Sequence, residues 1–166
     1  DIALKAALTG HLVFSTLHTN DAPSSITRLV NMGTPNYLIS AALTLIMAQR
    51  LARKSCLDCR VIDENITPKL LNSIGFLPEQ SSRAKIYKGK GCEECSGTGY
   101  KGRMGIYEIL EIDNELKAGI LSNLQQTELN AIAKKNGFRT MQDMGQDLLL
   151  SGDLSFAEYE RVLQSN

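Results

Sequence analysis

The chain has 166 residues, a length that suits one ordinary domain or one domain with a small inserted subdomain. Lys and Arg together number 18, as do Asp and Glu, and this zero net charge argues against a nucleic-acid or polybasic membrane partner. Hydrophobic residues make up 43% of the chain, and no apolar run reaches the roughly 18 residues that span a membrane, so we expect no direct membrane insertion.

The opening sequence DIALKAALTG has no initiating Met and lacks the basic and apolar segments of a signal peptide. We therefore expect a piece of a longer protein. Residues 11–17 (HLVFSTL) are apolar on both alternating faces, which favours a strand covered on both sides in a parallel sheet. Polar residues follow, and Asp21 is a good N-cap for a helix that ends near Gly33. This order of elements is half of a β-α-β unit.

A second helix is predicted over residues 37–53, because its first three turns are apolar almost all round and its end is basic. Residues 55–102 are polar and glycine-rich, and only residues 67–74 have a helical pattern there. Residues 103–112 alternate and predict a strand. Four short helices are expected after it, at residues 114–122, 127–135, 140–150 and 155–163.

The four cysteines form two C-x-x-C pairs that are separated by 32 residues: Cys56, Cys59, Cys92 and Cys95. Four thiolates can close a tetrahedron around Zn²⁺ and leave no position for water, which indicates a structural metal site. Lys54 and Arg60 flank the first pair and favour the thiolate form. Residues 55–102 hold too few apolar side chains for a core of their own, so a metal cross-link is expected there.

Two other interpretations of the cysteines stay open, namely free buried thiols and a redox C-x-x-C pair. The run CEECSGTG at residues 92–99 also resembles the C-x-x-C-x-G-x-G repeat of Hsp40-type chaperones. Those proteins carry four such repeats and this chain has one. A non-enzymatic zinc-binding interaction module is therefore the alternative hypothesis.

A polar loop follows the first predicted strand and contains Thr16, His18, Thr19 and Asn20. In doubly wound α/β folds, ligands bind outside the carboxyl ends of the strands, where this loop would lie. The cluster is therefore a candidate for sensing a phosphate or positioning a water molecule. The other interpretation is that His18 caps the next helix or satisfies a buried carbonyl.

The run TGHLVFSTLHTNDA at residues 9–22 resembles the histidine box of the type II secretion and type IV pilus assembly ATPases. The similarity continues through AQRLAR at residues 48–53, the two cysteine pairs, and GTGYKGRMGIYE at residues 97–108. It is weaker after Glu111, where GFRTM at residues 137–141 fits and residues 155–166 are only loosely similar. The tetracysteine site favours the assembly and secretion ATPases over the retraction motors of pili.

The resemblance implies an α/β fold that is the carboxyl-terminal portion of a RecA-like P-loop NTPase core, with a tetracysteine zinc insert and a helical tail. It places the core at residues 1–54, the zinc subdomain at 55–102, and a strand with the helical region at 103–166. His18 matches the histidine that lies near the terminal phosphate, Thr16 is a weaker catalytic candidate, and His11 matches a structural position. Basic family positions that could contact nucleotide or a subunit interface are matched by Arg50, Arg53 and Arg103.

The resemblance also implies ATP and Mg²⁺ as ligands of a longer protein, a hexameric ring, and partners in the platform of the inner membrane. It implies a cytoplasmic location beside the bacterial inner membrane. The chain contains no G-x-x-x-x-G-K-[ST] loop, which cradles the phosphates in this class of enzyme. We therefore expect the 166 residues alone to be inactive.

Overall fold

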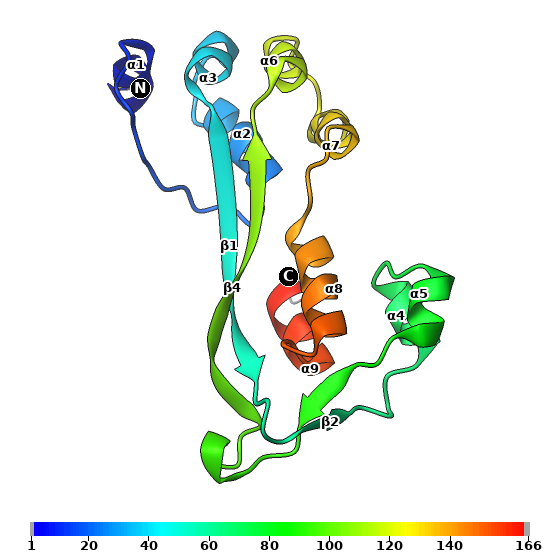
Figure 1. Cartoon of the computed structure of the whole chain (residues 1–166). Coiled ribbons are helices and arrows are strands. Elements are labelled where there is room, and N and C mark those ends of the chain that lie inside the picture. The colour runs from blue at the N-terminus through cyan, green and yellow to red at the C-terminus, as the bar shows by residue number, and fades with distance from the viewer. Residues whose placement is uncertain (1, 165–166) are drawn as a thin grey trace. The chain divides into compact units, whose positions relative to one another are not determined.

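The computed structural model describes residues 2–164, and Figure 1 shows their helices and strands. The chain forms two compact units, and each unit combines two separate stretches of sequence. The first unit comprises Asp1–Gln49 and Tyr107–Thr140, and the second comprises Arg50–Ile106 and Met141–Asn166. Segments that are far apart in the sequence therefore share each core.

The first unit contains the histidine loop, which is the polar segment with Thr16, His18, Thr19 and Asn20. It also contains the helices α1 (Ile2–Leu8), α2 (Ala22–Asn31), α3 (Asn36–Ala42), α6 (Asn114–Leu121) and α7 (Gln126–Lys135). The start of α2 follows from its local sequence, because the Asp21 side chain accepts a hydrogen bond from the Ser24 N–H and Pro23 lies in the first turn. The helix ends before Gly33, whose φ of 81° is readily available only to glycine.

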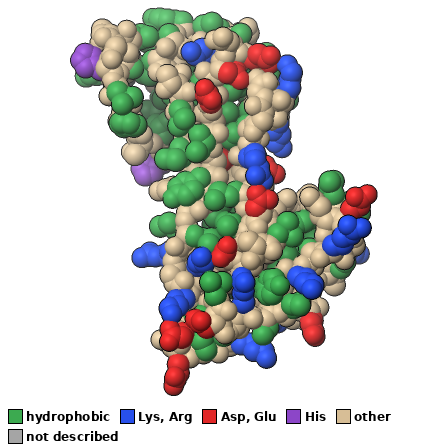
Figure 2. Space-filling view, viewed as in Figure 1, with side chains coloured by type: hydrophobic (Ala, Val, Ile, Leu, Met, Phe, Trp, Pro, Cys, Tyr) green, Lys and Arg blue, Asp and Glu red, His purple; other side chains and the backbone are tan. Residues whose placement is uncertain are grey.

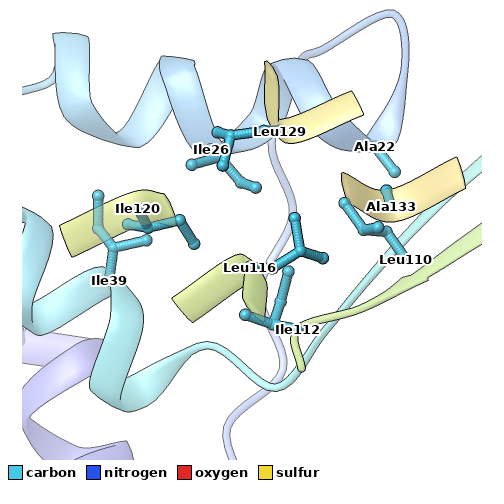
Figure 3. Packing of buried hydrophobic residues seen from close by; sticks show 9 residues of the cluster. All are labelled: Ala22, Ile26, Ile39, Leu110, Ile112, Leu116, Ile120, Leu129 and Ala133. Carbon is cyan, nitrogen blue, oxygen red and sulfur yellow. The ribbon is translucent and has the colours of Figure 1, made fainter. Parts of the chain in front are cut away.

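Aliphatic side chains from α2, α3, α6, α7 and the end of β4 form the core of the first unit (Figure 3). The buried members of this cluster include Ile26 of α2, Ile39 of α3, Leu116 and Ile120 of α6, and Leu129 of α7. The fully buried members each bury enough apolar area to contribute about 1.5–3 kcal/mol to folding. This core fixes the position of α2, which directly follows the histidine loop.

Two long strands, β1 (Leu45–Ser55) and β4 (Tyr100–Glu111), pair in a two-stranded sheet and run in opposite directions (Figure 1). Each of them contributes residues to both units. In β1 the exposed residues alternate with less exposed ones from Leu45 to Ala52, which is the period of a strand with two different faces.

The second unit contains the cysteine pairs and has the short elements β2 (Arg60–Ile62), α4 (Pro68–Ser73), α5 (Pro78–Arg83), β3 (Tyr87–Gly89), η1 (Glu93–Cys95), α8 (Met141–Ser151), α9 (Phe156–Tyr159) and η2 (Glu160–Gln164). Strands β2 and β3 pair antiparallel, with Val61 opposite Lys88. Leu149, Leu154 and Tyr159 are buried in this unit. The carboxyl-terminal helices thus share a unit with the cysteine region.

The strand predicted over residues 11–17 is wrong for this structure. These residues form an irregular segment between α1 and α2 (Figure 1), and Leu12 and Phe14 are 81% and 87% exposed. A strand needs a neighbour for its backbone hydrogen bonds. Within residues 2–164 the two sheets consist of β1 with β4 and β2 with β3, so this segment has no such neighbour.

The helix predicted over residues 37–53 is also wrong beyond its first part. Helix α3 ends at Ala42, and Leu43 adopts an extended backbone that leads into β1. The pattern that is apolar all round came from a strand with apolar side chains on both faces, including Leu45, Ile46 and Met47. Periodicity alone cannot separate that case from a buried helix.

The other helices and strands that were predicted are confirmed, but residues 55–102 also contain the helix α5, where only residues 67–74 were expected to be helical. Thr67 caps α4 by accepting a hydrogen bond from the Leu70 N–H, and residues 103–112 fall largely within β4. The four short helices after β4 match α6, α7, α8 and α9 with η2, although η2 is π-helical. Among the described residues, no helix combines the length and apolar character needed to cross a membrane.

Candidate metal centre and histidine loop

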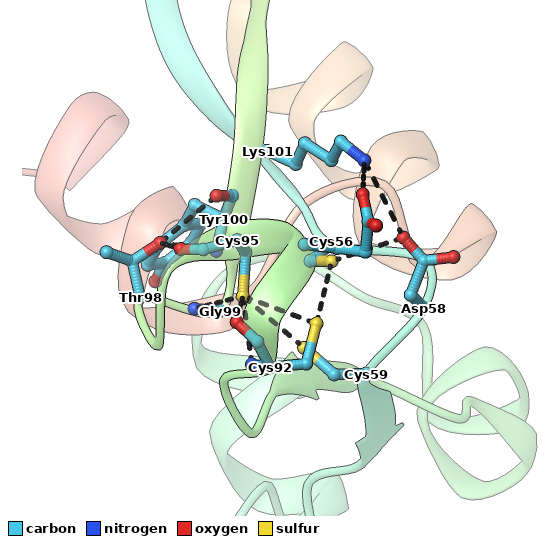
Figure 4. A network of polar contacts seen from close by, with 10 residues as sticks. Cys56, Asp58, Cys59, Cys92, Cys95, Thr98, Gly99, Tyr100 and Lys101 are labelled. Atoms are coloured by element: carbon cyan, nitrogen blue, oxygen red, sulfur yellow. Dashed lines mark hydrogen bonds and ion pairs between the residues drawn. The ribbon is translucent and has the colours of Figure 1, made fainter.

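The four cysteines converge in the second unit from two separate loops (Figure 4). Cys56 directly follows β1 and Cys59 directly precedes β2. Cys92 precedes the short helical turn η1, and Cys95 ends it. All four sulfur atoms lie within 4.8 Å of one another. The structure thus brings together the four residues that were predicted from the sequence to be metal ligands.

The spacing of the sulfur atoms fits a tetrahedral metal site. The Sγ–Sγ distances are 3.9 Å for Cys56 and Cys92, 3.8 Å for Cys59 and Cys95, and 3.7 Å for Cys92 and Cys95. A tetrahedron with Zn–S bonds of about 2.3 Å has edges of about 3.8 Å. These distances are far from the roughly 2.05 Å of a disulfide bond, and all four thiols are free. The cluster is therefore the right size for one zinc ion.

The backbone around the second pair is folded tightly enough to require glycine. The Gly99 N–H and the Cys92 N–H both donate to the Cys95 sulfur, at 3.2 Å each. Gly91 has a φ of 92°, and a Cβ atom there would lie 2.4 Å from the carbonyl oxygen of Gly97. Glycine at position 91 is thus needed for the close approach of the two ends of this loop, at Gly91 and Gly97.

The two buried sulfur atoms have different electrostatic surroundings. Burial raises the pKa of the Cys56 thiol to about 12, whereas the backbone N–H of Cys92, followed by that of Gly99, lowers the pKa of Cys95 to about 6. Hydrogen bonds to sulfur favour the thiolate, and burial without a counter-charge opposes it. A bound divalent cation would supply the missing positive charge at Cys56.

The basic residues that flank the first pair have partners outside the cluster. Lys54 pairs with Asp153 at 3.2 Å, and the Arg60 guanidinium lies 5.2 Å from the centre of the Tyr87 ring. The cation drawn beside the cluster in Figure 4 is instead Lys101, which pairs with Glu94 at 2.5 Å. Lys101 has a raised pKa, chiefly because Glu94 accepts its hydrogen bond.

The histidine loop lies in the first unit. His18 is exposed, and both histidine side chains are visible at the surface in Figure 2. His18 lines an open depression of about 310 Å³ together with polar residues of the loop and of α2, and with Gln126. His11 has a different setting, because its Nδ1 lies 3.0 Å from the Thr9 hydroxyl. Thr16 is exposed and does not line the depression.

Hydrogen bonds attach the histidine loop to the helix that follows it. The Thr19 hydroxyl lies 2.8 Å from the Ser25 hydroxyl, and the Asp21 side chain accepts from the Ser24 N–H at 2.7 Å. The residues that line the depression with His18 supply hydroxyl and amide groups, and they also include one acidic residue, Asp21, and one basic residue, Arg28. Such groups could orient an anion or a water molecule.

The three candidate arginines belong to the second unit, whereas His18 and Thr16 belong to the first. Arg53 donates two side-chain hydrogen bonds to Glu158, and its guanidinium lies 4.1 Å from the centre of the Tyr100 ring. Arg103 is exposed, and Arg50 is partly buried. Arg53 is therefore engaged in the packing of its own unit.

Two buried carboxylates have roles that the sequence did not indicate. Glu108 accepts a hydrogen bond from the backbone N–H of Ala22, 86 residues away, and Glu158 accepts one from the backbone N–H of Arg53, 105 residues away. No local pattern could have revealed these partners, because both contacts arise only when distant segments meet.

Comparison with known proteins gives the chain a family. The sequence profile described as "Type II/IV secretion system protein" matches residues 1–161. The chain belongs to the type II/IV secretion system protein family. This family match covers the histidine loop, the four cysteines and the helical tail together.

Curated relatives within the family include both pilus and secretion proteins. The type IV pilus assembly ATPase PilB of Thermus thermophilus is 44% identical over 95% of this chain and 18% of its own length. PilB of Pseudomonas aeruginosa is 41% identical over 98% of the chain and 28% of its own length. The type II secretion system protein HxcR of the same organism is 36% identical over 97% of this chain and 30% of its own length. The chain thus spans less than a third of the length of these relatives.

Proposed function

We propose that this family member is the carboxyl-terminal part of an ATPase that powers type IV pilus assembly or type II protein secretion. The observation that carries the proposal is the family match over residues 1–161, together with relatives that are named pilus assembly ATPases. The relatives are several times longer than the chain. In the longer protein, the remaining sequence supplies the phosphate-binding loop and Mg²⁺-binding acidic groups of a RecA-like core.

In this proposal, His18 acts at the terminal phosphate of ATP. It is exposed at an open polar depression, and hydrogen bonds between the loop and α2 restrict its backbone. In this role the imidazole of His18 orients the attacking water, or its contact with the phosphate changes the position of α2. Thr16, Arg50, Arg53 and Arg103 are weaker candidates for the same catalytic or subunit-interface chemistry. Of these, Arg53 already has Glu158 as a partner.

The four cysteines hold one structural zinc ion in this proposal. Four sulfur ligands at tetrahedral spacing leave no open position on the metal, so the ion would supply a cross-link and no catalytic step. Zinc would join the loop that follows β1 to the loop that precedes β4. The other candidate metals are less well suited to an all-thiolate, closed tetrahedral site with no redox task.

The exposed apolar segment at residues 11–17 becomes a strand of the RecA-like sheet in the longer protein. Leu12 and Phe14 are largely exposed here although the segment has the composition of a buried strand. Subunits of the longer protein assemble into a hexameric ring in the cytoplasm, beside an inner-membrane platform. ATP hydrolysis in that ring would drive the growth of a pilus or pseudopilus.

The test of the proposed function is steady-state ATP hydrolysis by the longer protein and by this chain. We expect turnover by the longer protein only, because the chain contains no G-x-x-x-x-G-K-[ST] loop. Hydrolysis by the purified 166-residue chain that is abolished by a substitution within it would contradict the proposal. The absence of ATP hydrolysis by the longer protein under conditions where it is folded would contradict it as well.

A further inference from the structure

Glu108 is a buried carboxylate in the first unit. Its residue is 3% exposed, and it lies on β4 between the core positions Ile106 and Leu110. A charged group in such a position is costly unless hydrogen bonds compensate its lost hydration. Its Oε1 accepts a hydrogen bond from the backbone N–H of Ala22 at 2.5 Å. Ala22 is itself fully buried and is the first residue of α2.

This contact satisfies the first backbone N–H group of α2. The first N–H groups of a helix have no partner within the helix. The Ala22 N–H donates to Glu108, Pro23 has no N–H, and the Ser24 N–H donates to Asp21. The carboxylate of Glu108 also lies at the positive end of the helix dipole. Glu108 therefore fixes where α2 begins with respect to strand β4.

The start of α2 is directly connected to the histidine loop. Ala22 is four residues after His18, and the Thr19 hydroxyl is linked to the Ser25 hydroxyl in the first turn of α2 at 2.8 Å. The side chains between His18 and the helix are thus held by the same helical turn that Glu108 holds. A displacement of this turn would move the imidazole of His18.

We propose that Glu108 is a positioning residue for His18 in ATP hydrolysis by the longer protein. This inference rests on the proposed function, because it assigns to Glu108 an effect that is exerted through the histidine loop. Glu108 contacts neither nucleotide nor water in this role. It keeps the first turn of α2, and hence the backbone of the loop, at a fixed distance from the sheet.

A double-mutant cycle separates positioning from general stabilisation, because residues that act through one another have non-additive effects. Glu108→Gln keeps the side-chain shape and an acceptor oxygen but removes the charge. We expect it to lower kcat of the longer protein by roughly 3- to 10-fold, with little change in KM. In a His18→Ala background the same substitution should change kcat by less than about 2-fold. Glu111→Gln, on an exposed position of the same strand, is the matched control and should leave kcat unchanged.

A second measurement uses the 166-residue chain itself. Hydrogen exchange of the Ala22 amide should become faster by at least about 10-fold in Glu108→Gln, whereas exchange of the Leu116 amide at the start of α6 should not change. Equal kcat losses in both backgrounds, or an unchanged kcat in Glu108→Gln, would overturn the positioning role while leaving the proposed function intact. A wild-type rate in His18→Ala would overturn both the role of His18 and the positioning role. Faster exchange of the Ala22 amide in Glu108→Gln without an effect on kcat would show that Glu108 only stabilises the start of α2.

Discussion

Oε2 of Glu158 lies 2.6 Å from Nη2 of Arg53, and the Glu158 residue is fully buried. The same carboxylate accepts from the Arg53 backbone N–H at 2.7 Å and from Nε of Arg161 at 2.8 Å. Burial alone would raise the pKa of Glu158, but the hydrogen bonds from Arg161 and Arg53 outweigh it and lower that pKa to about 2. The carboxylate thus ties α9 and η2 to strand β1 within the second unit.

Replacing Glu158 should therefore destabilise the second unit. We expect Glu158→Gln to lower the free energy of unfolding of the chain by on the order of 2 kcal/mol at pH 7, because two arginines lose a buried charged partner. Chemical denaturation monitored by circular dichroism would measure this loss. Glu115→Gln is the matched control, since Glu115 pairs with Lys135 at the surface and should cost less than about 0.5 kcal/mol. Equal effects of the two substitutions would contradict the role of Glu158.

The same carboxylate should give stability a specific pH dependence. Because the folded-state pKa of Glu158, about 2, lies below the ordinary value of 4.5, its contribution is present above pH 4.5. The contribution is lost as the pH falls from about 4.5 through about 2, where the folded state also takes up the proton. The free energy of unfolding, measured from pH 6 down to pH 2, should therefore fall more steeply for the wild-type chain than for Glu158→Gln. Parallel curves over this range would show that Glu158 does not titrate as inferred.

The tetracysteine cluster predicts one zinc ion per chain. Protein purified without chelator should contain close to one equivalent by elemental analysis, and Cys92→Ser should reduce that content several-fold. The substitution should speed hydrogen exchange in β2 and β3 and leave the core of α2 and α6 protected, because the two regions belong to different units. Ser82→Ala, at an exposed position of α5, should change neither quantity. Four freely reactive thiols in native protein without metal would disprove the site.

Two glycines in the second cysteine loop test the geometry of that site. Gly91→Ala places a Cβ atom 2.4 Å from a backbone oxygen, whereas Gly97→Ala places one in open space. Both positions have a positive φ, so the conformational cost of about 1 kcal/mol is common to both substitutions. We expect Gly91→Ala to weaken zinc binding at least about 10-fold more than Gly97→Ala in a chelator competition assay. Equal affinities would show that Gly91 and Gly97 do not approach each other as closely as described.

The sequence predicted the features that depend on neighbouring residues. The helical pattern of residues 67–74 indicated α4, and Asp21 as N-cap indicated the start of α2, because such patterns and caps act within a few residues. The cysteine cluster was predicted because each C-x-x-C pair brings two sulfur atoms together in a local turn, and a four-sulfur site then forms where the two pairs come together. These features are specified by residue type and spacing along the chain.

The features that the sequence did not reveal depend on distant segments. Residues 37–53 were predicted to form one helix, but their apolar pattern also fits a strand with two apolar faces. Only the pairing of β1 with β4 decides between these two structures. Glu108 and Glu158 look like ordinary acidic residues in the sequence. Each gains its role from a backbone N–H more than 80 residues away, at Ala22 and Arg53 respectively.

The apolar segment at residues 11–17 provides a test of how the chain joins the rest of the longer protein. Phe14 is 87% exposed here, so Phe14→Ala should change the stability of the 166-residue chain by less than about 0.5 kcal/mol. In the longer protein we expect Phe14 to be buried in the RecA-like sheet, where removal of its ring should cost about 3–5 kcal/mol. Leu77→Ala is the control, because Leu77 is 63% exposed at the start of α5 and should have a small effect in both proteins. Thermal denaturation of the four variants beside their wild types would measure the difference. A small effect of Phe14→Ala in the longer protein would show that residues 11–17 stay at the surface there, and the proposed strand would then be wrong.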